Sequence, residues 1–397
     1  MNPLLSKLQP YPFERLAKLK ASAPYVGDKS HIALSIGEPK QPAPEVAIDA
    51  IQKSFDELTQ YPGTRGLPEL RSTISDWINR RFHTKVCADT EILPCNGTRE
   101  ALFSIAQALV APESLIAMPN PFYQIYEGAA YLAGATPLYI SARDTSVNTP
   151  DYDSIDSATW GRVELLYLCS PDNPSGQCHT LQDFKKLFEL ADKHNFVIVS
   201  DECYSELYRD GTQAPLGILD ACRQLGRNQF TNIVAVHSLS KRSNLPGLRS
   251  GFIAGDRAVI DTFFKYRTYH GCAMGLPAQR GSIAAWSDES HVETNRRLYD
   301  EKYRYVEQHL TPDLLTGIPD AGFYLWLPVG SDDLAYAQSL FEQQNVTVLP
   351  GQFLAREVNG KNPGKGFVRI ALVAPLNECK EAIHRINQHW DTYNAEA

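Results

Sequence analysis

Clusters of basic residues are scarce in this sequence. Its 397 residues carry 38 Lys and Arg against 46 Asp and Glu, which gives a formal net charge of −8 at pH 7. A surface that binds nucleic acid needs concentrated positive charge to replace the counterions of the phosphate backbone. The sequence therefore predicts small-molecule chemistry and no nucleic-acid partner.

Long apolar runs are also lacking. The first twenty residues, MNPLLSKLQPYPFERLAKLK, place prolines and charges where a secretion signal needs an uninterrupted apolar core. No later segment approaches the roughly 18 apolar residues that a membrane-spanning helix needs. We therefore expect no membrane partner and a cytoplasmic location.

Metal-binding patterns are missing as well. The ten histidines form no H-x-x-x-H or H-E-x-x-H pattern, and the eight cysteines form no C-x-x-C pair. We expect neither a metal site nor a disulfide framework, and most of the cysteines should be small buried hydrophobic residues. The cysteines are Cys87, Cys95, Cys169, Cys178, Cys203, Cys222, Cys272 and Cys379.

Short apolar runs alternate with helical patterns through the middle of the chain. Strand-like runs occur at residues 92–93, 114–118, 136–140, 163–168, 196–201 and 233–236. Helical patterns cover residues 43–58, 101–110 and 181–191, and Thr180 with Asp183 predicts a capping box for the third. Continuous apolar strands flanked by helices are typical of an α/β fold, in which a mostly parallel sheet is covered on both faces.

Polar residues follow four of these strands directly. They are Asn96 to Thr98, Asn173, Asp201 with Tyr204, and Ser238 with Lys241. In open parallel sheets, ligands bind at the carboxyl ends of the strands. The sequence therefore predicts one site that contains all four groups.

Lys241 is the most distinctive residue of this set. It follows a buried strand in Ser238-Leu-Ser-Lys241, and partial desolvation there should lower its pKa, as a lysine that binds an aldehyde covalently requires. A solvated loop lysine is the alternative. Thr98, which follows the first of these strands, is expected to cap the next helix. The first N–H groups of that helix, beside Gly97, could bind phosphate.

The motifs together resemble a known family. NGT at 96–98, NPSG at 173–176, SDECY at 200–204, SLSK at 238–241 and GLRSG at 247–251 occur in the order seen in class I and II aminotransferases. These are pyridoxal-phosphate enzymes of fold type I. The Gly37-Glu-Pro turn, the Tyr61-Pro-Gly segment and Arg369 extend the resemblance over essentially the whole chain.

The resemblance implies a role for each motif residue. Lys241 would hold pyridoxal 5′-phosphate covalently and move the proton at the substrate Cα. Asp201 would pair with the pyridine nitrogen, while Tyr204 and Asn173 would hydrogen-bond the phenolic oxygen. Arg249, Gly97, Thr98, Ser238 and Ser240 would bind the phosphate, and Tyr123, or less favourably Phe122, would stack on the ring.

The resemblance also implies the substrate contacts and the assembly. Arg369, assisted by the backbone at Gly37 and by Asn173, would bind the substrate α-carboxylate. Tyr61 would reach the phosphate of the neighbouring subunit, which implies a homodimer with shared active sites. The expected organisation is an arm at 1–44 packing on the small domain, a large cofactor-binding domain at 45–285 and a small domain at 286–397. Residues 282–310 should form a helical link, and 321–327 and 346–350 should be small-domain strands.

The substrate is indicated by a narrower resemblance. LQPYPFERL at 8–16, GEP-x-x-P at 37–42 and the stretch 271–280 are similar to succinyldiaminopimelate transaminases of bacterial lysine biosynthesis. That similarity implies exchange of an amino group between glutamate and N-succinyl-2-amino-6-oxopimelate. The far end of such a polyanion needs further cations, for which Lys40, Arg65 and Arg280 are the candidates.

Three other readings stay open. The same reaction could act on aspartate, aromatic amino acids or succinylornithine, and carbon–sulfur lyases share this fold and lysine. Transcription regulators that carry an aminotransferase-like domain are a non-enzymatic class. Against them, the resemblance begins near residue 1, which leaves no room for a helix-turn-helix domain, and the net charge is negative.

Overall fold

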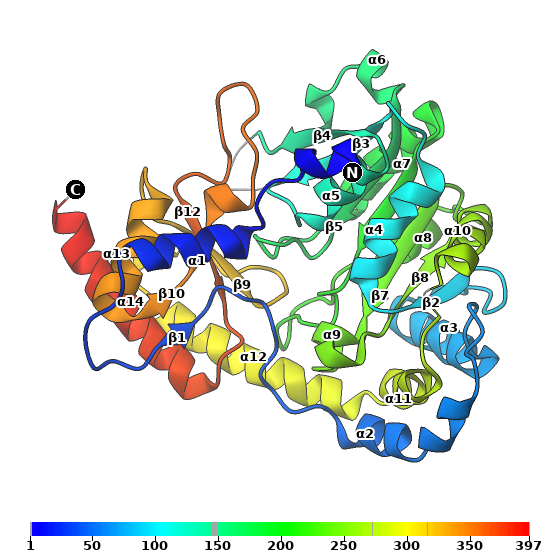
Figure 1. The fold of residues 1–397 in the computed structure, drawn as a ribbon, viewed down its shortest axis with the longest axis horizontal. Coiled ribbons are helices and arrows are strands. Elements are labelled where there is room, and N and C mark those ends of the chain that lie inside the picture. The colour runs from blue at the N-terminus through cyan, green and yellow to red at the C-terminus, as the bar shows by residue number, and fades with distance from the viewer. Residues whose placement is uncertain (1, 144–148, 272, 316, 397) are drawn as a thin grey trace.

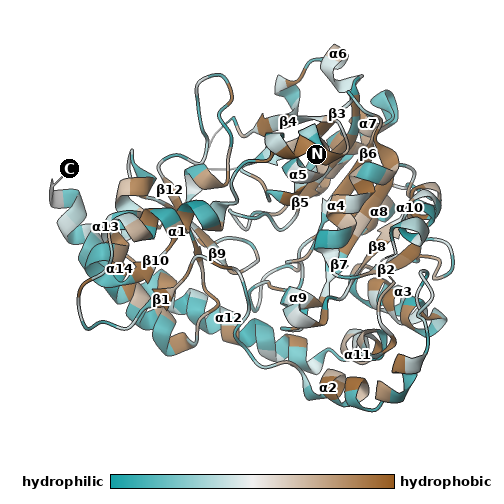
Figure 2. Cartoon of the chain, viewed as in Figure 1, coloured by the Kyte–Doolittle hydropathy of each residue, from teal (hydrophilic) through white to brown (hydrophobic). Residues whose placement is uncertain are grey.

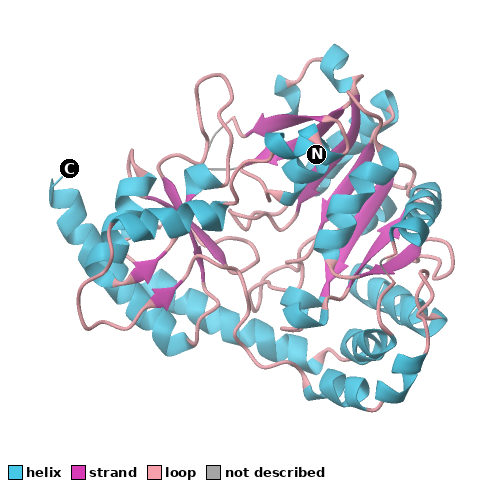
Figure 3. Cartoon of the chain, viewed as in Figure 1, coloured by secondary structure: helices cyan, strands magenta, loops and turns pink. Residues whose placement is uncertain are grey.

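A seven-stranded sheet forms the centre of the larger part of the molecule (Figures 1 and 3). The structure is a computed structural model that describes residues 2–143, 149–271, 273–315 and 317–396. In spatial order the strands are β2 (Ile92–Cys95), β8 (Gly251–Gly255), β7 (Ile233–Ser238), β6 (Val197–Asp201), β5 (Val163–Cys169), β3 (Leu115–Asn120) and β4 (Thr136–Ser141).

The sheet is mostly parallel, as predicted. Strands β7, β6, β5, β3 and β4 pair in parallel, whereas β8 runs antiparallel to its neighbours β2 and β7. Almost every residue of β3, β5 and β7 is buried, which fits strands covered on both faces. The α/β fold is therefore confirmed.

Helices cover both faces of the sheet, and the side chains of each strand alternate between two apolar cores. One core joins the strands to α3 (Pro68–Phe82), α7 (Leu181–His194), α8 (Ile218–Gln224) and α11 (Leu276–Ser287). The other joins them to α4 (Thr98–Leu109), α5 (Ile125–Leu132) and α10 (Arg257–His270). Figure 2 shows the central strands as mainly hydrophobic. Helices α6 (Ser157–Trp160) and α9 (Leu239–Arg242) are short.

The C-terminal part of the chain builds a smaller three-stranded sheet. Strand β12 (Phe367–Ala371) lies between β11 (Leu349–Pro350) and β9 (Tyr324–Pro328), and both pairings are antiparallel. Helices α12 (Ser290–His309), α13 (Asp333–Gln344) and α14 (Leu376–Glu396) pack around it. In the described part of the chain, no helix is long and apolar enough to cross a membrane.

Two predicted helices are interrupted. The pattern at 43–58 is α2 (Glu45–Gln52) followed by a separate 3₁₀ turn, Phe55–Thr59, and the hydroxyl of Ser54 donates to the Ile51 carbonyl at the break. The link predicted at 282–310 is broken at Asp288, which is extended. Its carboxylate accepts hydrogen bonds from the Ser290 hydroxyl and the His291 N–H. These local side-chain bonds replace helical ones.

The N-terminal arm touches both parts of the molecule. Helix α1 (Pro12–Ser22) packs on α13, and β1 (Ile32–Ala33) pairs in parallel with β10 (Val346–Thr347). The 3₁₀ turn at Pro3–Lys7 contacts α5 beside the large sheet. The arm therefore crosses the opening between the two sheets, as Figure 1 shows.

Cysteines are mostly buried, as expected. Among the seven that the structure describes, all are free, Cys95, Cys169, Cys222 and Cys379 are buried, and Cys87 is exposed. Cys178 and Cys203 are partly buried. Cys272 lies outside the described residues. The cysteine with the most consequential position is Cys203, which faces the cavity described next.

Candidate active site

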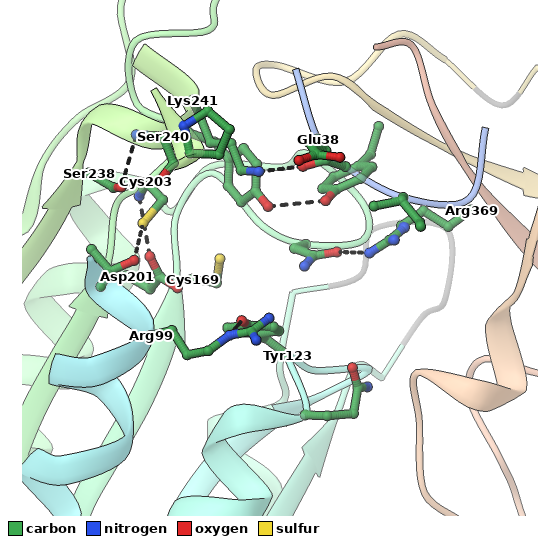
Figure 4. Close-up of a pocket in the computed structure, with 18 of the residues that line it drawn as sticks. Glu38, Arg99, Tyr123, Cys169, Asp201, Cys203, Ser238, Ser240, Lys241 and Arg369 are labelled. Atoms are coloured by element: carbon green, nitrogen blue, oxygen red, sulfur yellow. Dashed lines mark hydrogen bonds between the residues drawn. The ribbon is translucent and has the colours of Figure 1, made fainter. Parts of the chain in front are cut away.

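One cavity collects the predicted site residues. Its volume is about 500 Å³, and it lies at the carboxyl ends of β5, β6 and β7, facing β12 and the arm (Figure 4). The predicted residues that line it are Gly37, Thr98, Tyr123, Asn173, Asp201, Tyr204, Ser238, Ser240, Lys241, Arg249 and Arg369. Residues more than 330 positions apart in the chain therefore meet in one place, and a pocket of this size is typical of small-molecule sites.

Lys241 projects into the cavity from the short helix α9. Ser238 is the N-cap of that helix, and its hydroxyl accepts a hydrogen bond of 3.0 Å from the Ser240 N–H. This cap fixes the turn that follows β7 and aims Lys241 inward. The Lys241 ammonium donates to the backbone carbonyl of Gly37.

Burial lowers the pKa of Lys241 to about 8. Desolvation is the largest cause, and the positive charges of Arg369 and Arg249 add to it, whereas Cys203 and Glu38 oppose it. At neutral pH, the unprotonated fraction of a lysine with this pKa is larger than that of an exposed lysine. The predicted desolvation is confirmed, and this amine is suited to nucleophilic and proton-transfer chemistry.

Asp201 is a buried carboxylate at the end of β6. Its Oδ2 accepts a hydrogen bond of 3.0 Å from the Tyr126 hydroxyl, and its Oδ1 accepts one of 3.3 Å from the Cys203 N–H. Burial raises the pKa of Asp201 above its usual value, and the hydrogen bonds from Cys203 and Tyr126 offset only part of that rise. A carboxylate held this way can stabilise a cation placed in the cavity.

Arg369 lies across the cavity on β12. Its guanidinium donates 2.7 Å hydrogen bonds to the Asn173 side-chain oxygen and to the Ser35 carbonyl, and its plane lies over the Tyr324 ring. Its Nε is buried and has no partner among the described residues. Asn173 and Arg369 therefore form one polar unit, and the Tyr204 hydroxyl lies beside it, 3.1 Å from the Tyr324 hydroxyl.

A second polar group gathers on the opposite wall. The Ser238 and Ser240 hydroxyls are 2.9 Å apart, and Thr98 starts helix α4 beside them. Arg249 adds a guanidinium, which donates to the carbonyls of Pro246 and Asn96. Hydroxyls, a guanidinium and a helix N-terminus form a set of donors suited to an anion such as a phosphate.

Gly97 packs directly against the guanidinium of Arg249 in this group of donors. A Cβ on Gly97 would lie 2.3 Å from Arg249 Nη2, and the φ of 78° there also favours glycine. Gly97, and not Thr98, is the N-cap of α4, so the predicted capping role of Thr98 is wrong. The Thr98 hydroxyl instead lies 3.1 Å from Cys203 Sγ.

The remaining predicted residues divide between the cavity and the surface. Tyr123 lines the cavity, whereas Phe122 is buried against Tyr139. Tyr61 is fully exposed and contributes nothing to the cavity of its own chain. The three cations predicted for the far end of the substrate lie outside the lining, and each is paired with an acid: Lys40 with Glu38, Arg65 with Asp261, and Arg280 with Glu57 and Glu69.

Several residues of the site were not predicted. Tyr126 bonds Asp201, Tyr324 lies under Arg369, and Tyr11 to Phe13 of the arm form an outer wall with Arg99 nearby. Arg99 stands inside the NGTRE motif, where the sequence pattern predicts only the start of a helix. A cation one residue after the proposed anion-binding turn was the signal that could have marked it.

Comparison with known proteins agrees with this geometry. Residues 29–386 match the family model for aminotransferase class I and II. A solved aminotransferase from Neisseria meningitidis is 48% identical, with a TM-score of 0.94 over 98% of this chain and 100% of that one.

Two further relatives carry more specific names. A probable N-succinyldiaminopimelate aminotransferase from Thermus thermophilus is 28% identical, with a TM-score of 0.83 over 95% of this chain and 100% of that one. An LL-diaminopimelate aminotransferase of Dehalococcoides mccartyi is 28% identical over 96% of this chain and 97% of its own length. The chain therefore belongs to the class I and II aminotransferases, whose cofactor is pyridoxal 5′-phosphate.

Proposed function

We propose that the cavity binds pyridoxal 5′-phosphate between Lys241, Asp201 and the donor group around Arg249. Lys241 would hold the aldehyde carbon, and Asp201 the pyridine nitrogen. Thr98, Ser238, Ser240 and Arg249, with the N–H groups that follow Gly97, would hold the phosphate. Tyr204 and Asn173 would contact the phenolic oxygen, and Tyr123 the ring face.

The described residues fit this cofactor. Asp201 is a buried carboxylate that two donors hold in place. Lys241 is desolvated enough for its pKa to fall to about 8. Arg249 and Gly97 are so closely packed that no side chain fits at position 97, which leaves that space to backbone N–H groups and a ligand.

The chemistry then divides among the residues of this chain. Pyridoxal 5′-phosphate, when bound, supplies an electron sink for the pair left on the substrate Cα. Lys241, as a free amine, acts as the base that takes the proton from the substrate Cα. As an ammonium, it then acts as the acid that gives the proton back later in the reaction. Asp201 keeps positive charge on the ring nitrogen, and Arg369 fixes the substrate by its α-carboxylate in a bidentate contact.

We further propose that the amino group moves between glutamate and N-succinyl-2-amino-6-oxopimelate. The size of the cavity is the observation that supports this proposal. Its volume is about 500 Å³, and it extends past Lys241 and Arg369 to the outer wall at Tyr11 to Phe13. A long substrate has room there. The name of the Thermus relative supports the succinylated compound.

A second candidate is the unsuccinylated compound, LL-diaminopimelate. It is favoured by the name of the Dehalococcoides relative, which matches nearly the whole chain. The amino forms of the two candidates, N-succinyl-LL-diaminopimelate and LL-diaminopimelate, share the seven-carbon pimelate skeleton and differ only in the succinyl group at the far end.

Relative kcat/KM values decide between the substrates. With glutamate as donor, we expect the succinylated oxo acid to exceed oxaloacetate and phenylpyruvate by at least about tenfold, since a far end that fills the cavity adds binding energy. In the reverse direction, N-succinyl-LL-diaminopimelate should exceed LL-diaminopimelate by a similar factor. Equal or reversed ratios would refute the proposed substrate and leave the cofactor assignment untouched.

Gly97→Ala should weaken cofactor binding by about tenfold or more. The added Cβ would displace the Arg249 guanidinium, which costs part of a charge-assisted contact with phosphate. Equilibrium binding of pyridoxal 5′-phosphate to the apoprotein measures this. The matched control is Gly211→Ala, because Gly211 has the same φ of 78° but nothing within 4 Å of its Cβ. Equal affinities in the two variants would contradict the role of Arg249.

We also propose a homodimer in which Tyr61 completes the partner's site. Val46, Ile48, Phe55, Leu58 and Tyr61 form an exposed apolar segment, and Tyr61 has no contact with the cavity of its own chain. Inactive Lys241→Ala chains mixed with impaired Tyr61→Ala chains should regain activity after exchange of subunits. A mixture no more active than its components would contradict shared sites.

A further inference from the structure

The N-terminal turns of α12 hold the main chain at Lys241 from outside the cavity. The side-chain amide of Asn295 donates hydrogen bonds of 3.2 Å and 3.4 Å to the carbonyls of Lys241 and Arg242. The next residue of that turn, Ser243, has its hydroxyl 2.8 Å from His291 Nε2. Asn295 and His291 are not part of the cavity lining, and none of the roles proposed above uses them.

Helix α9 needs these bonds because it is only one turn long. The last carbonyls of a helix have no acceptor role within the helix, and those of Lys241 and Arg242 stand at the end of α9. Asn295 is 2% exposed, so its contact with both carbonyls is shielded from solvent. The Asn244 side chain donates to the Asn295 side-chain oxygen at 3.3 Å, which fixes the orientation of the amide. Asn295 therefore fixes the main chain at the residue whose side chain enters the cavity.

A second chain of hydrogen bonds reaches the same turn. Because the Asp288 carboxylate can only accept, His291 Nδ1 donates to it, and a neutral His291 accepts the Ser243 O–H at Nε2. Burial lowers the pKa of His291, which favours the neutral ring at pH 7. Serine, histidine and aspartate in this order resemble a hydrolase triad, but Ser243 is fully buried and does not line the cavity. The chain therefore holds the turn in place and offers no nucleophile to a substrate.

The same face of α12 also supports the ring that the Lys241 ammonium faces. His291, Asn295 and Tyr299 recur every four positions and so lie on one side of the helix. The Tyr299 ring stacks on Phe323 with the centroids 5.6 Å apart, and the Lys241 ammonium lies 5.5 Å from the Phe323 centroid. Figure 1 shows α12 running from beside α9 toward the small sheet. One helix face therefore supports both the main chain and the side chain of Lys241.

We propose that Asn295 is a positioning residue for Lys241, and that His291 assists it through Ser243. Together they keep the Lys241 amine at the point where it meets the cofactor aldehyde and the substrate proton. Attachment joins the Lys241 nitrogen to the aldehyde carbon, and the aldehyde oxygen leaves as water. The inference rests on the proposed binding of pyridoxal 5′-phosphate at Lys241. It does not depend on which amino acid the protein uses.

Two forms of the cofactor test the inference without turnover. Pyridoxal and pyridoxamine 5′-phosphate share the ring and the phosphate, but only the first has an aldehyde that Lys241 can bind covalently. Asn295→Leu keeps the approximate size of the side chain and removes the donor. We expect the affinity of the apoprotein for pyridoxal 5′-phosphate to fall by about tenfold or more, and that for pyridoxamine 5′-phosphate to change by less than about threefold. His291→Leu, at a partly exposed position, should show the same selectivity with a loss of about three- to tenfold.

Asn387→Leu is the matched control. The Asn387 amide donates a hydrogen bond of 2.6 Å to the carbonyl of His309, the last residue of α12, so it bonds a helix end outside the cavity in the same way. This variant should lower the melting temperature and leave both affinities unchanged. Hydrogen exchange of residues 239–245 in the apoprotein, followed by mass spectrometry, needs no cofactor. It should be at least about tenfold faster in Asn295→Leu than in Asn387→Leu.

The possible results separate the inference from the proposed function. Equal losses of affinity for the two cofactor forms in Asn295→Leu, or no loss for either, would overturn the positioning role. Unchanged hydrogen exchange at 239–245 would overturn it too. If the unmodified protein bound the two forms equally well, the proposed attachment at Lys241 would be wrong, and hydrogen exchange would still decide whether Asn295 fixes this turn.

Discussion

Lys241→Ala should lower kcat by about 10⁴-fold or more, because the variant loses both the covalent attachment of the cofactor and the amine that moves the Cα proton. The structure supports this because Lys241 is desolvated and its pKa falls to about 8. The loss should appear in kcat measured with saturating glutamate and acceptor. Cofactor binding through the phosphate donors should persist, so the variant should still hold pyridoxal 5′-phosphate without a covalent bond.

Lys302→Ala is the matched control for Lys241→Ala. Lys302 is a second buried lysine, whose pKa burial also lowers, but it donates to the Leu372 carbonyl and does not line the cavity. It should lower the melting temperature and leave kcat within a few-fold of the unmodified value. Loss of activity in both variants, or in neither, would mean that Lys241 has no special role.

Asp201→Asn should lower kcat by about 10²–10³-fold, the usual effect of removing one preorganised electrostatic contact. An amide can still accept the hydrogen bond of Tyr126, so the fold around β6 should persist. It cannot, however, keep positive charge on the ring nitrogen. The absorbance of the bound cofactor as a function of pH reports this change separately from kcat.

The control for Asp201→Asn is another buried carboxylate. Asp300 on α12 is 5% exposed, is paired with Arg209 and Arg304, and lies outside the cavity lining. Asp300→Asn should reduce thermal stability without a comparable loss of kcat. If Asp201→Asn retained full activity, the pairing of Asp201 with the ring nitrogen would be wrong.

Local sequence was sufficient for the strands and for the residues that follow them. Apolar runs predicted β3, β5, β6 and β7, and the polar groups after three of them, Asn173, Asp201 and Lys241, meet in the cavity. The capping box of Thr180 and Asp183 is also present. These features depend on residues that are near one another in the chain, so pattern alone reveals them.

The sequence predictions that were wrong, and the site residues that they missed, involve contacts that the local sequence pattern does not show. Thr98 was expected to cap α4, but the positive φ of Gly97 moves the cap back by one residue. Arg99 donates a hydrogen bond to Tyr123, which lies 24 residues later in the chain, and Asp201 accepts one from Tyr126, 75 residues earlier. Such pairings are set by the fold. The division of the chain into domains at residues 44 and 285 stays a prediction.

Transfer of labelled nitrogen tests the central claim most directly. The holoenzyme would be incubated with ¹⁵N-glutamate and N-succinyl-2-amino-6-oxopimelate, and the products analysed by mass spectrometry. We predict ¹⁵N in N-succinyl-LL-diaminopimelate, one equivalent of 2-oxoglutarate for each labelled product, and no labelled ammonia. Recovery of all the ¹⁵N in glutamate, with no labelled N-succinyl-LL-diaminopimelate, would contradict the account.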